Sequence, residues 1–283
     1  MARLPWKLRR IDRRRFGREG TGSVSVDVTD LRSFYDSPLG QVSCRLVGRV
    51  MAALWPDLRG LSLLGLGYPG PYLPALGASP ERILVFMPAA QGAMRWPAEG
   101  PSATTLADPL MMPLADGSID RLLVIHALET AEDPAEFLHE VARLLSPPGR
   151  ALIVCPNRRG LWARMDRTPF GQGQPFSRSQ LRRLMQRTQL TPERWAEALY
   201  LPPFRGRFLL SGAAMWERGG AALSLPFAGL HVVEVVKSVH RPVLVRQRRR
   251  ARVREPILLP VPAACDPGWE PQRRSLTSLR PDP

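Results

Sequence analysis

The sequence predicts an α/β protein built on a doubly wound, mostly parallel sheet. Short apolar runs of strand length recur through the middle of the chain, and stretches with helical or turn character separate them. Runs without polar alternation are typical of strands whose two faces are both covered by helices. The first of these runs ends in a glycine-rich loop, and open α/β sheets bind their ligands beside such loops.

A helical pattern extends from Asp27 to Trp55. Asp30 is the candidate cap of its first part, and Ser37 to Gly40 predicts a break because this stretch contains a proline and a glycine. After the break, apolar residues recur at helical spacing, at Val42, Leu46, Val50 and Leu54. The first strand follows at Leu61 and continues into the loop Gly65 to Gly70.

The remaining elements alternate in the same way. Four more strands are expected, at Arg82–Phe86, Ala103–Ala107, Arg121–Ile125 and Ala151–Cys155. Asp133 and Pro134 cap an amphipathic helix before the last of these strands. Downstream, the pattern predicts helices at Arg178–Thr188, capped by Ser177, and at Leu209–Arg218, and strands at Trp195–Leu201 and His231–Lys237 that can pair antiparallel at a sheet edge.

The positive charge of the chain is concentrated at its two ends. The formal net charge is +15, yet residues 1–20 hold eight Lys and Arg against two acidic residues, and residues 241–283 hold ten Arg against four. We therefore expect a basic, disordered extension over 1–23, a folded domain over 24–240 and an Arg/Pro-rich tail over 241–283. Such ends would contact polyanions non-specifically at low salt.

The remaining composition favours a cytoplasmic protein. No apolar run reaches the length of a membrane span, so no membrane partner is expected. The three cysteines, Cys44, Cys155 and Cys265, lack the spacing of a metal site or a disulfide framework and predict reduced structural thiols. No metal is expected, and the oligomeric state stays open.

The most specific motifs lie between Asp108 and Arg150. They comprise, in order, Asp108 to Leu114, Asp116 to Asp120, His126 to Glu129, Asp133-Pro134, Glu140 to Leu145 and Pro148 to Arg150. Their order and spacing resemble class I S-adenosylmethionine-dependent methyltransferases, in particular the small-molecule type 11 group. The resemblance implies a seven-stranded Rossmann-like methyltransferase fold and methyl transfer from S-adenosylmethionine to a small-molecule acceptor that the sequence does not identify.

The resemblance also assigns a cofactor site. Gly65, Gly67 and Gly70 would pass under the methionyl and ribose parts of S-adenosylmethionine, where a side chain would clash. Asp108 matches the residue whose carboxylate accepts from the adenine amino group. Met87 stands where the family usually has the acidic residue that grips the ribose hydroxyls.

Residues beyond the fourth and fifth strands are candidates for chemistry and substrate binding. His126 is the candidate catalytic base, because it lies at the carboxyl edge of the sheet. Arg158, Trp162, Arg164 and Phe170 lie where this fold usually builds its substrate lid, and would bind an anionic or aromatic acceptor by bidentate and cation–π contacts. The alternative is a surface loop whose aromatic side chains attach it to the sheet edge.

Three functions stay open at this point. Two acidic positions of the family are Leu63 and Met87 here, and losing one charged partner costs about 1.5–3 kcal/mol, ten- to a hundredfold in affinity. The chain is therefore either a methyltransferase or a non-catalytic binding protein of the same fold. An NAD-type oxidoreductase would rest on the glycine spacing alone. An open pocket above Gly65 and Gly67 would favour the enzyme, and a pocket filled by Tyr68 or Met87 would favour the binding protein.

Overall fold

The computed structural model describes residues 26–76, 80–203, 212–222 and 227–238. The chain divides into two units, residues 1–240 and 241–283, and all described residues belong to the first. The predicted extension over 1–23 and the predicted tail over 241–283 lie outside the described residues. No helix in the described ranges is long and apolar enough to cross a membrane.

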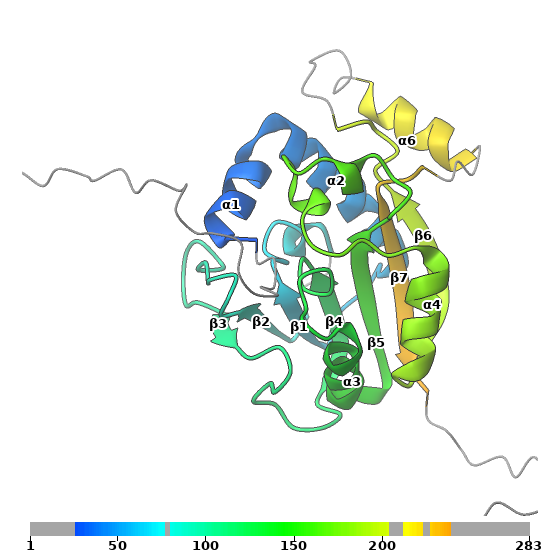
Figure 1. Ribbon diagram of the computed structural model, residues 1–283. Coiled ribbons are helices and arrows are strands. Elements are labelled where there is room, and N and C mark those ends of the chain that lie inside the picture. The colour runs from blue at the N-terminus through cyan, green and yellow to red at the C-terminus, as the bar shows by residue number, and fades with distance from the viewer. Residues whose placement is uncertain (1–25, 77–79, 204–211, 223–226, 239–283) are drawn as a thin grey trace, which may run out of the picture. The chain divides into compact units, whose positions relative to one another are not determined.

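One sheet of seven strands forms the centre of the described unit (Figure 1). Its order is β3-β2-β1-β4-β5-β7-β6, and β1 to β5 are parallel while β7 runs antiparallel to both neighbours. The predicted fold class and the antiparallel pairing of the last two strands are confirmed. The strands are β1 Ser62–Gly67, β2 Arg82–Pro88, β3 Thr104–Ala107, β4 Ile119–Ile125, β5 Leu145–Pro156, β6 Leu190–Ala198 and β7 Leu230–Lys237.

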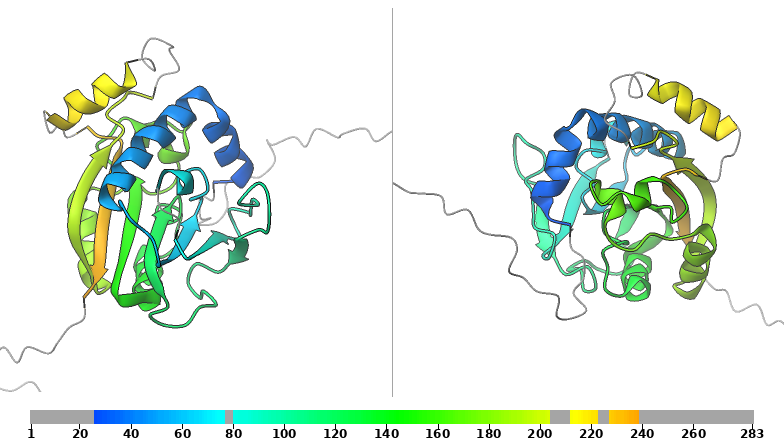
Figure 2. Two further views of the ribbon diagram at one scale, coloured as in Figure 1. Left: turned by 180° about the vertical axis from the view of Figure 1, so that it is seen from behind. Right: turned by 45° about the horizontal axis from the view of Figure 1, so that its top comes forward.

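Helices cover both faces of this sheet, as Figure 2 shows from two sides. α1 (Val28–Asp36) and α2 (Pro38–Leu54) pack on one face, and α3 (Pro134–Leu144) and α4 (Arg178–Arg187) on the other. Successive strand residues alternate between the two apolar cores, so Leu63 joins the first and Leu64 the second. One further α-helix in the described ranges is α6 (Ala213–Ala222).

Three local expectations need correction. Asp27, not Asp30, caps α1, because its carboxylate accepts from the amide of Thr29 at 2.7 Å. β6 begins at Leu190 and ends before Leu199, whose φ of 61° takes the backbone out of the strand region. α6 begins at Ala213, later than the expected Leu209, which lies outside the described residues.

The connection between β1 and β2 contains little helical structure in its described residues. Among the described residues of this connection, 68–76 and 80–81, one 3₁₀ turn, Leu73–Leu76, stands where a doubly wound unit places a helix. Pro69, Pro71 and Pro74 explain this, because proline has no N–H for a helical ladder. The amides that a helix N-terminus would offer to an anionic ligand group are therefore missing beside the glycine loop.

Candidate functional site

Gly67 fits the end of β1 against β4. Its φ is +84°, and a Cβ there would lie 2.1 Å from the carbonyl oxygen of Ile125. The next amide, from Tyr68, donates a hydrogen bond of 2.9 Å to that same oxygen. Only glycine tolerates this backbone angle together with this close approach. The contact with β4 is thus sufficient to explain the residue.

At the other two loop glycines, the space that a side chain would need is also taken up by neighbouring residues of this chain. A Cβ on Gly65 would stand 2.5 Å from the ring of Pro69, and one on Gly70 would stand 3.3 Å from the indole of Trp96. The space above the predicted cofactor loop is therefore occupied by protein atoms. Because these contacts explain the glycine spacing, the oxidoreductase hypothesis loses the one observation on which it rested.

Little space remains where the carboxyl ends of β1, β2, β3 and β4 meet. The cavity at this point measures about 10 Å³, which is about the room of one water molecule. Ligand pockets typically measure about 300–1,000 Å³. Met87 forms part of its wall and is 2% exposed. The cavity is lined by Leu66, Gly67, Phe86, Met87, Pro88, Ala107, Pro109, Met112, Ala127 and Phe137.

A second cavity of about 260 Å³ lies beside the loop, next to Gly70, Met87 and Trp96. Its remaining lining residues are Tyr68, Pro69, Pro71, Val85, Met94, Arg95 and Ala98. No acidic side chain belongs to this lining, so nothing there can accept from ribose hydroxyls as a carboxylate would. The cavity is apolar in character and slightly below the usual size of a ligand pocket.

Asp108 is exposed and holds its own loop. Its Oδ1 accepts from the amide of Leu110 at 2.9 Å, which is an Asx turn. Leu110 is itself exposed. The Asp108 carboxylate, which was predicted to bind adenine, thus stabilises its own loop. Asp108 lines neither of the two cavities.

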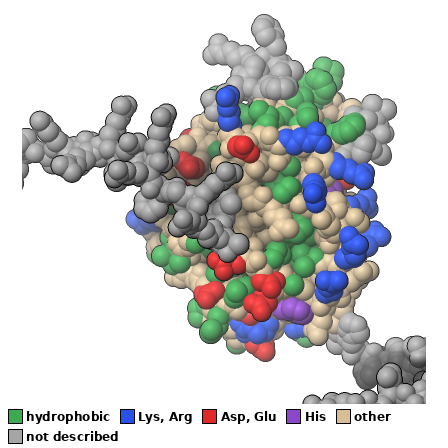
Figure 3. Space-filling view, viewed as in Figure 1, with side chains coloured by type: hydrophobic (Ala, Val, Ile, Leu, Met, Phe, Trp, Pro, Cys, Tyr) green, Lys and Arg blue, Asp and Glu red, His purple; other side chains and the backbone are tan. Residues whose placement is uncertain are grey.

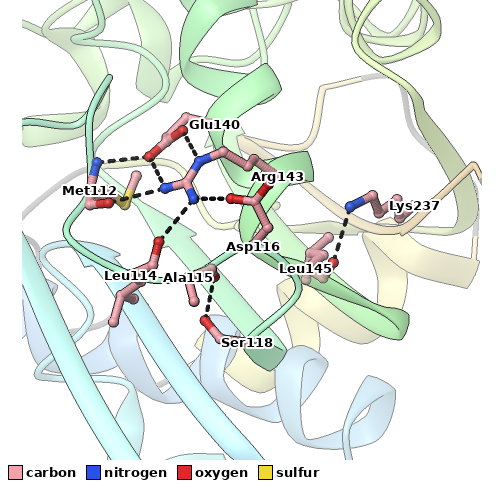
Figure 4. Close-up of polar contacts among 9 residues, drawn as sticks. All are labelled: Met112, Leu114, Ala115, Asp116, Ser118, Glu140, Arg143, Leu145 and Lys237. Carbon is pink, nitrogen blue, oxygen red and sulfur yellow. Dashed lines mark hydrogen bonds and ion pairs between the residues drawn. The ribbon is translucent and has the colours of Figure 1, made fainter.

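The loop after Asp108 is fixed to α3 by a polar cluster (Figure 4). The Arg143 guanidinium donates to both carboxylate oxygens of Glu140, at 2.7 Å each, and to the carbonyls of Met112 and Leu114. It also pairs with Asp116. Burial raises the pKa of Glu140, but the bonds from Arg143 and the Met112 amide outweigh this effect and hold it below its usual value. These motif residues therefore act as a scaffold.

His126 lies in a buried polar chain. Its Nε2 is 2.7 Å from the Tyr35 hydroxyl and its Nδ1 is 3.1 Å from Glu129 Oε1. The Tyr35 hydroxyl also contacts that of Tyr72, at 2.8 Å. Burial raises the pKa of both tyrosines well above the ordinary value, so both phenols stay protonated. His126 is 1% exposed, and both of its ring nitrogens have partners.

This arrangement leaves His126 without a free position for a substrate. The Phe170 ring stands 4.8 Å from the imidazole, and Tyr35 stacks on Tyr68 at 5.6 Å between centroids. A role as general base would require Tyr35 to leave Nε2. Glu129 Oε2 has no hydrogen-bond partner among the described residues, but Glu129 lines none of the cavities described here.

The predicted substrate residues separate into two groups. Trp162 and Phe170 are buried, and the Trp162 indole donates to the Leu201 carbonyl at 2.7 Å. Arg158 and Arg164 are exposed. The aromatic pair attaches the loop to the sheet edge, and the structure does not bring the four side chains together around a cavity.

Sequence reasoning missed Tyr35, Tyr72 and Glu129. The spacing of His126 and Glu129, three residues apart, was a usable signal, because it lets the two side chains meet. Nothing in the sequence pointed to Tyr35, which is 91 residues from His126.

S-adenosylmethionine, which the resemblance implies, does not fit the described arrangement. The cavity at the strand ends is far too small, Met87 offers no carboxylate, and Asp108 bonds its own loop. S-adenosylmethionine could bind only if the side chains that fill the carboxyl ends of β1 to β4 moved away.

Comparison with known proteins shows what the central part of the chain resembles. Residues 66–153 match the methyltransferase domain family. A methyltransferase structure solved in the complex with the Haloferax volcanii Trm112 methyltransferase activator aligns with a TM-score of 0.53 and 16% identity, covering 74% of this chain and 98% of that one. An S-adenosylmethionine-dependent methyltransferase from Thermotoga maritima aligns with a TM-score of 0.51 and 14% identity, covering 74% and 96%. No curated protein sequence matches the chain. At such identities the structural likeness establishes the fold alone: the chain has the Rossmann-like fold of these methyltransferases, and its residues 66–153 match the methyltransferase domain.

Proposed function

We propose that the protein is a non-catalytic member of this family, a methyltransferase-fold binding protein that has lost affinity for S-adenosylmethionine. The observation that carries the proposal is the cavity of about 10 Å³ at the carboxyl ends of β1 to β4. A nucleoside cannot enter a space of that size. The missing acidic residue at Met87 and the proline-rich turn after Gly70 point in the same direction.

Opening this edge carries a substantial free-energy cost. Tyr68 would have to leave its stack on Tyr35, and Pro69 would have to leave the space above Gly65. Fully burying one large apolar side chain contributes about 1.5–3 kcal/mol. A cofactor would have to supply that energy without the charged partners that the family usually offers.

A second candidate is an S-adenosylmethionine-dependent methyltransferase that acts on a small molecule. The match of residues 66–153 to the methyltransferase domain favours it. In that function Gly65, Gly67 and Asp108 would hold the cofactor and His126 would be the base, while Arg158 and Trp162 would contact the acceptor. These roles remain predictions, and all require an opened edge.

Isothermal titration calorimetry of the full chain with S-adenosylmethionine and S-adenosylhomocysteine separates the two candidates. We expect no saturable heat for either compound up to about 1 mM, which corresponds to less than about 4 kcal/mol of binding free energy. Stoichiometric binding of either compound below that concentration would overturn the proposal and favour the enzyme. A thermal unfolding scan of the same sample verifies that the protein is folded.

A further inference from the structure

The largest cavity described here lies elsewhere on the sheet edge, at β5, β6 and β7. It measures about 700 Å³, which is within the usual range of small-molecule sites. It shares no residue with the glycine-loop cavities. Its lining residues are Asn157, Arg159, Ser177, Arg178, Ser179, Trp195, Ala196, Glu197, Tyr200 and His231.

His231 is a buried polar group without a partner in this cavity. Its side chain is 3% exposed, and neither ring nitrogen has a hydrogen-bond partner among the described residues. Glu197 Oε1 lies 3.7 Å from Nδ1, beyond hydrogen-bond distance. Burial, together with Arg178, lowers the pKa of His231 to about 4. The neutral ring therefore offers one donor and one acceptor, and leaving such a group unpaired costs about 1–3 kcal/mol.

Positive charge surrounds the same cavity. Arg159 and Arg178 line it, and α4, a helix of ten residues, begins at Arg178 after the cap Ser177. The Gln180 amide at this end already donates to Ser177 Oγ, so the helix attracts an anion through its dipole and its remaining first-turn amides. Figure 3 shows Lys and Arg side chains gathered over the side of the molecule where α4 and β6 lie, the right side of that view. Glu197 is the one acidic residue of the lining.

The backbone that carries Arg159 is fixed. Asn157 accepts from the Arg159 amide at 3.0 Å and donates to the Ala228 carbonyl at 2.9 Å. A Cβ on Gly160 would lie 2.5 Å from that same carbonyl oxygen, so the turn is closely packed against the segment before β7. A preorganised turn places Arg159 at the cavity with little loss of backbone entropy on binding.

Aromatic side chains form the third part of the wall. The Trp195 ring lies under the Arg178 guanidinium at 4.9 Å, and its centroid is 6.1 Å from that of His231. Tyr200 donates to Glu197 at 3.2 Å. A planar organic group can pack against such a wall while its charge meets the arginines.

We propose that this cavity binds a small organic anion, with its phosphate or carboxylate at Arg159, Arg178 and the start of α4, and a neutral polar group at His231. The size of the cavity and the depth of His231 favour a small molecule over a polymer, which would meet only the exposed arginines. The inference is independent of the proposed function, because the two sites have no residue in common.

Nuclear magnetic resonance tests the site on the full chain at about 150 mM salt, where non-specific attraction to the basic ends is screened. The probes are phenyl phosphate, benzoate and inorganic phosphate, which separate the two anionic groups from the contribution of the ring. The readout is the ring ¹⁵N signals of His231, assigned by their loss in His231→Asn. We expect saturable shifts with phenyl phosphate or benzoate, and weaker binding of inorganic phosphate.

Two pairs of variants make the result decisive. Arg159→Gln and Arg178→Gln should each weaken binding about tenfold, the usual effect of one charged hydrogen-bonding partner. Their matched controls are Arg182→Gln and Arg183→Gln, two exposed arginines of α4 outside the lining. The controls should retain affinity within about twofold. No saturable shift of His231 with any probe up to about 10 mM, or equal weakening in all four variants, would overturn the proposal.

Discussion

The two halves of the carboxyl edge of this sheet differ in what fills them. At β1 to β4, side chains of α1 and of the glycine loop occupy the space, and His126 has partners on both ring nitrogens. At β5 to β7 a cavity of about 700 Å³ is open, and His231 has none among the described residues. Buried polar groups are normally satisfied. Glu129 Oε2 also lacks a partner among the described residues, but it lines no cavity, whereas His231 lines the largest one. An unpaired group therefore indicates a ligand site only where there is also room for a ligand.

The largest expected effect is a loss of stability when the buried contacts of the closed half are removed. His126→Ala removes the imidazole that contacts both Tyr35 and Glu129, and leaves the Glu129 carboxyl buried without it. Leaving a buried hydrogen-bonding group without its partner costs about 1–3 kcal/mol, and the cavity left by the ring adds to this loss. Urea unfolding should show a loss of this size in the free energy of unfolding. His139→Ala, at an exposed position of α3, is the control and should stay within about 0.5 kcal/mol. A loss no larger than in the control would mean that the chain does not hold this edge closed.

The next effect concerns the open half: the free energy of unfolding should depend on pH through His231. Because the pKa of His231 is lowered from 6.5 to about 4 in the folded chain, the unfolded chain binds this proton first as the pH falls. The free energy of unfolding should therefore decrease between pH 6.5 and pH 4, by at most about 3 kcal/mol from this group. Arg178 and Arg159 oppose protonation, and Glu197 favours it, among the charged groups that line the cavity.

His231→Asn should flatten that part of the pH profile, measured by urea unfolding at several pH values over this window. His139→Asn is the matched control, and its profile should follow that of the unmodified chain. Equal flattening in both variants would contradict the assignment, because the slope would then come from other titrating groups.

The sequence predicted the fold well because its signals are local. Each apolar run has its strand, and Asp133 and Ser177 cap the expected helices. The closure of β1 to β4 was not predictable in this way. Glycine spacing is the same whether a ligand or Pro69 occupies the space, and Tyr35 reaches His126 across 91 residues. Arg158 was predicted for the substrate site, whereas Arg159 lines the larger cavity, because the direction of each side chain depends on the turn fixed by Asn157.

The smallest expected effect is that of Asp108→Asn, which tests whether this motif residue only stabilises its loop or also binds the cofactor. Asp108→Asn keeps an oxygen that can accept from the Leu110 amide, at an exposed position. The free energy of unfolding should therefore change by less than about 0.5 kcal/mol. If Asp108 instead accepted from an adenine amino group, loss of the charge would weaken S-adenosylmethionine binding about tenfold. Calorimetry on the unmodified chain and the variant measures this directly. Matching titrations without saturable heat would support a purely local role, whereas a tenfold difference would place a working cofactor site in the half of the edge that the structure shows filled.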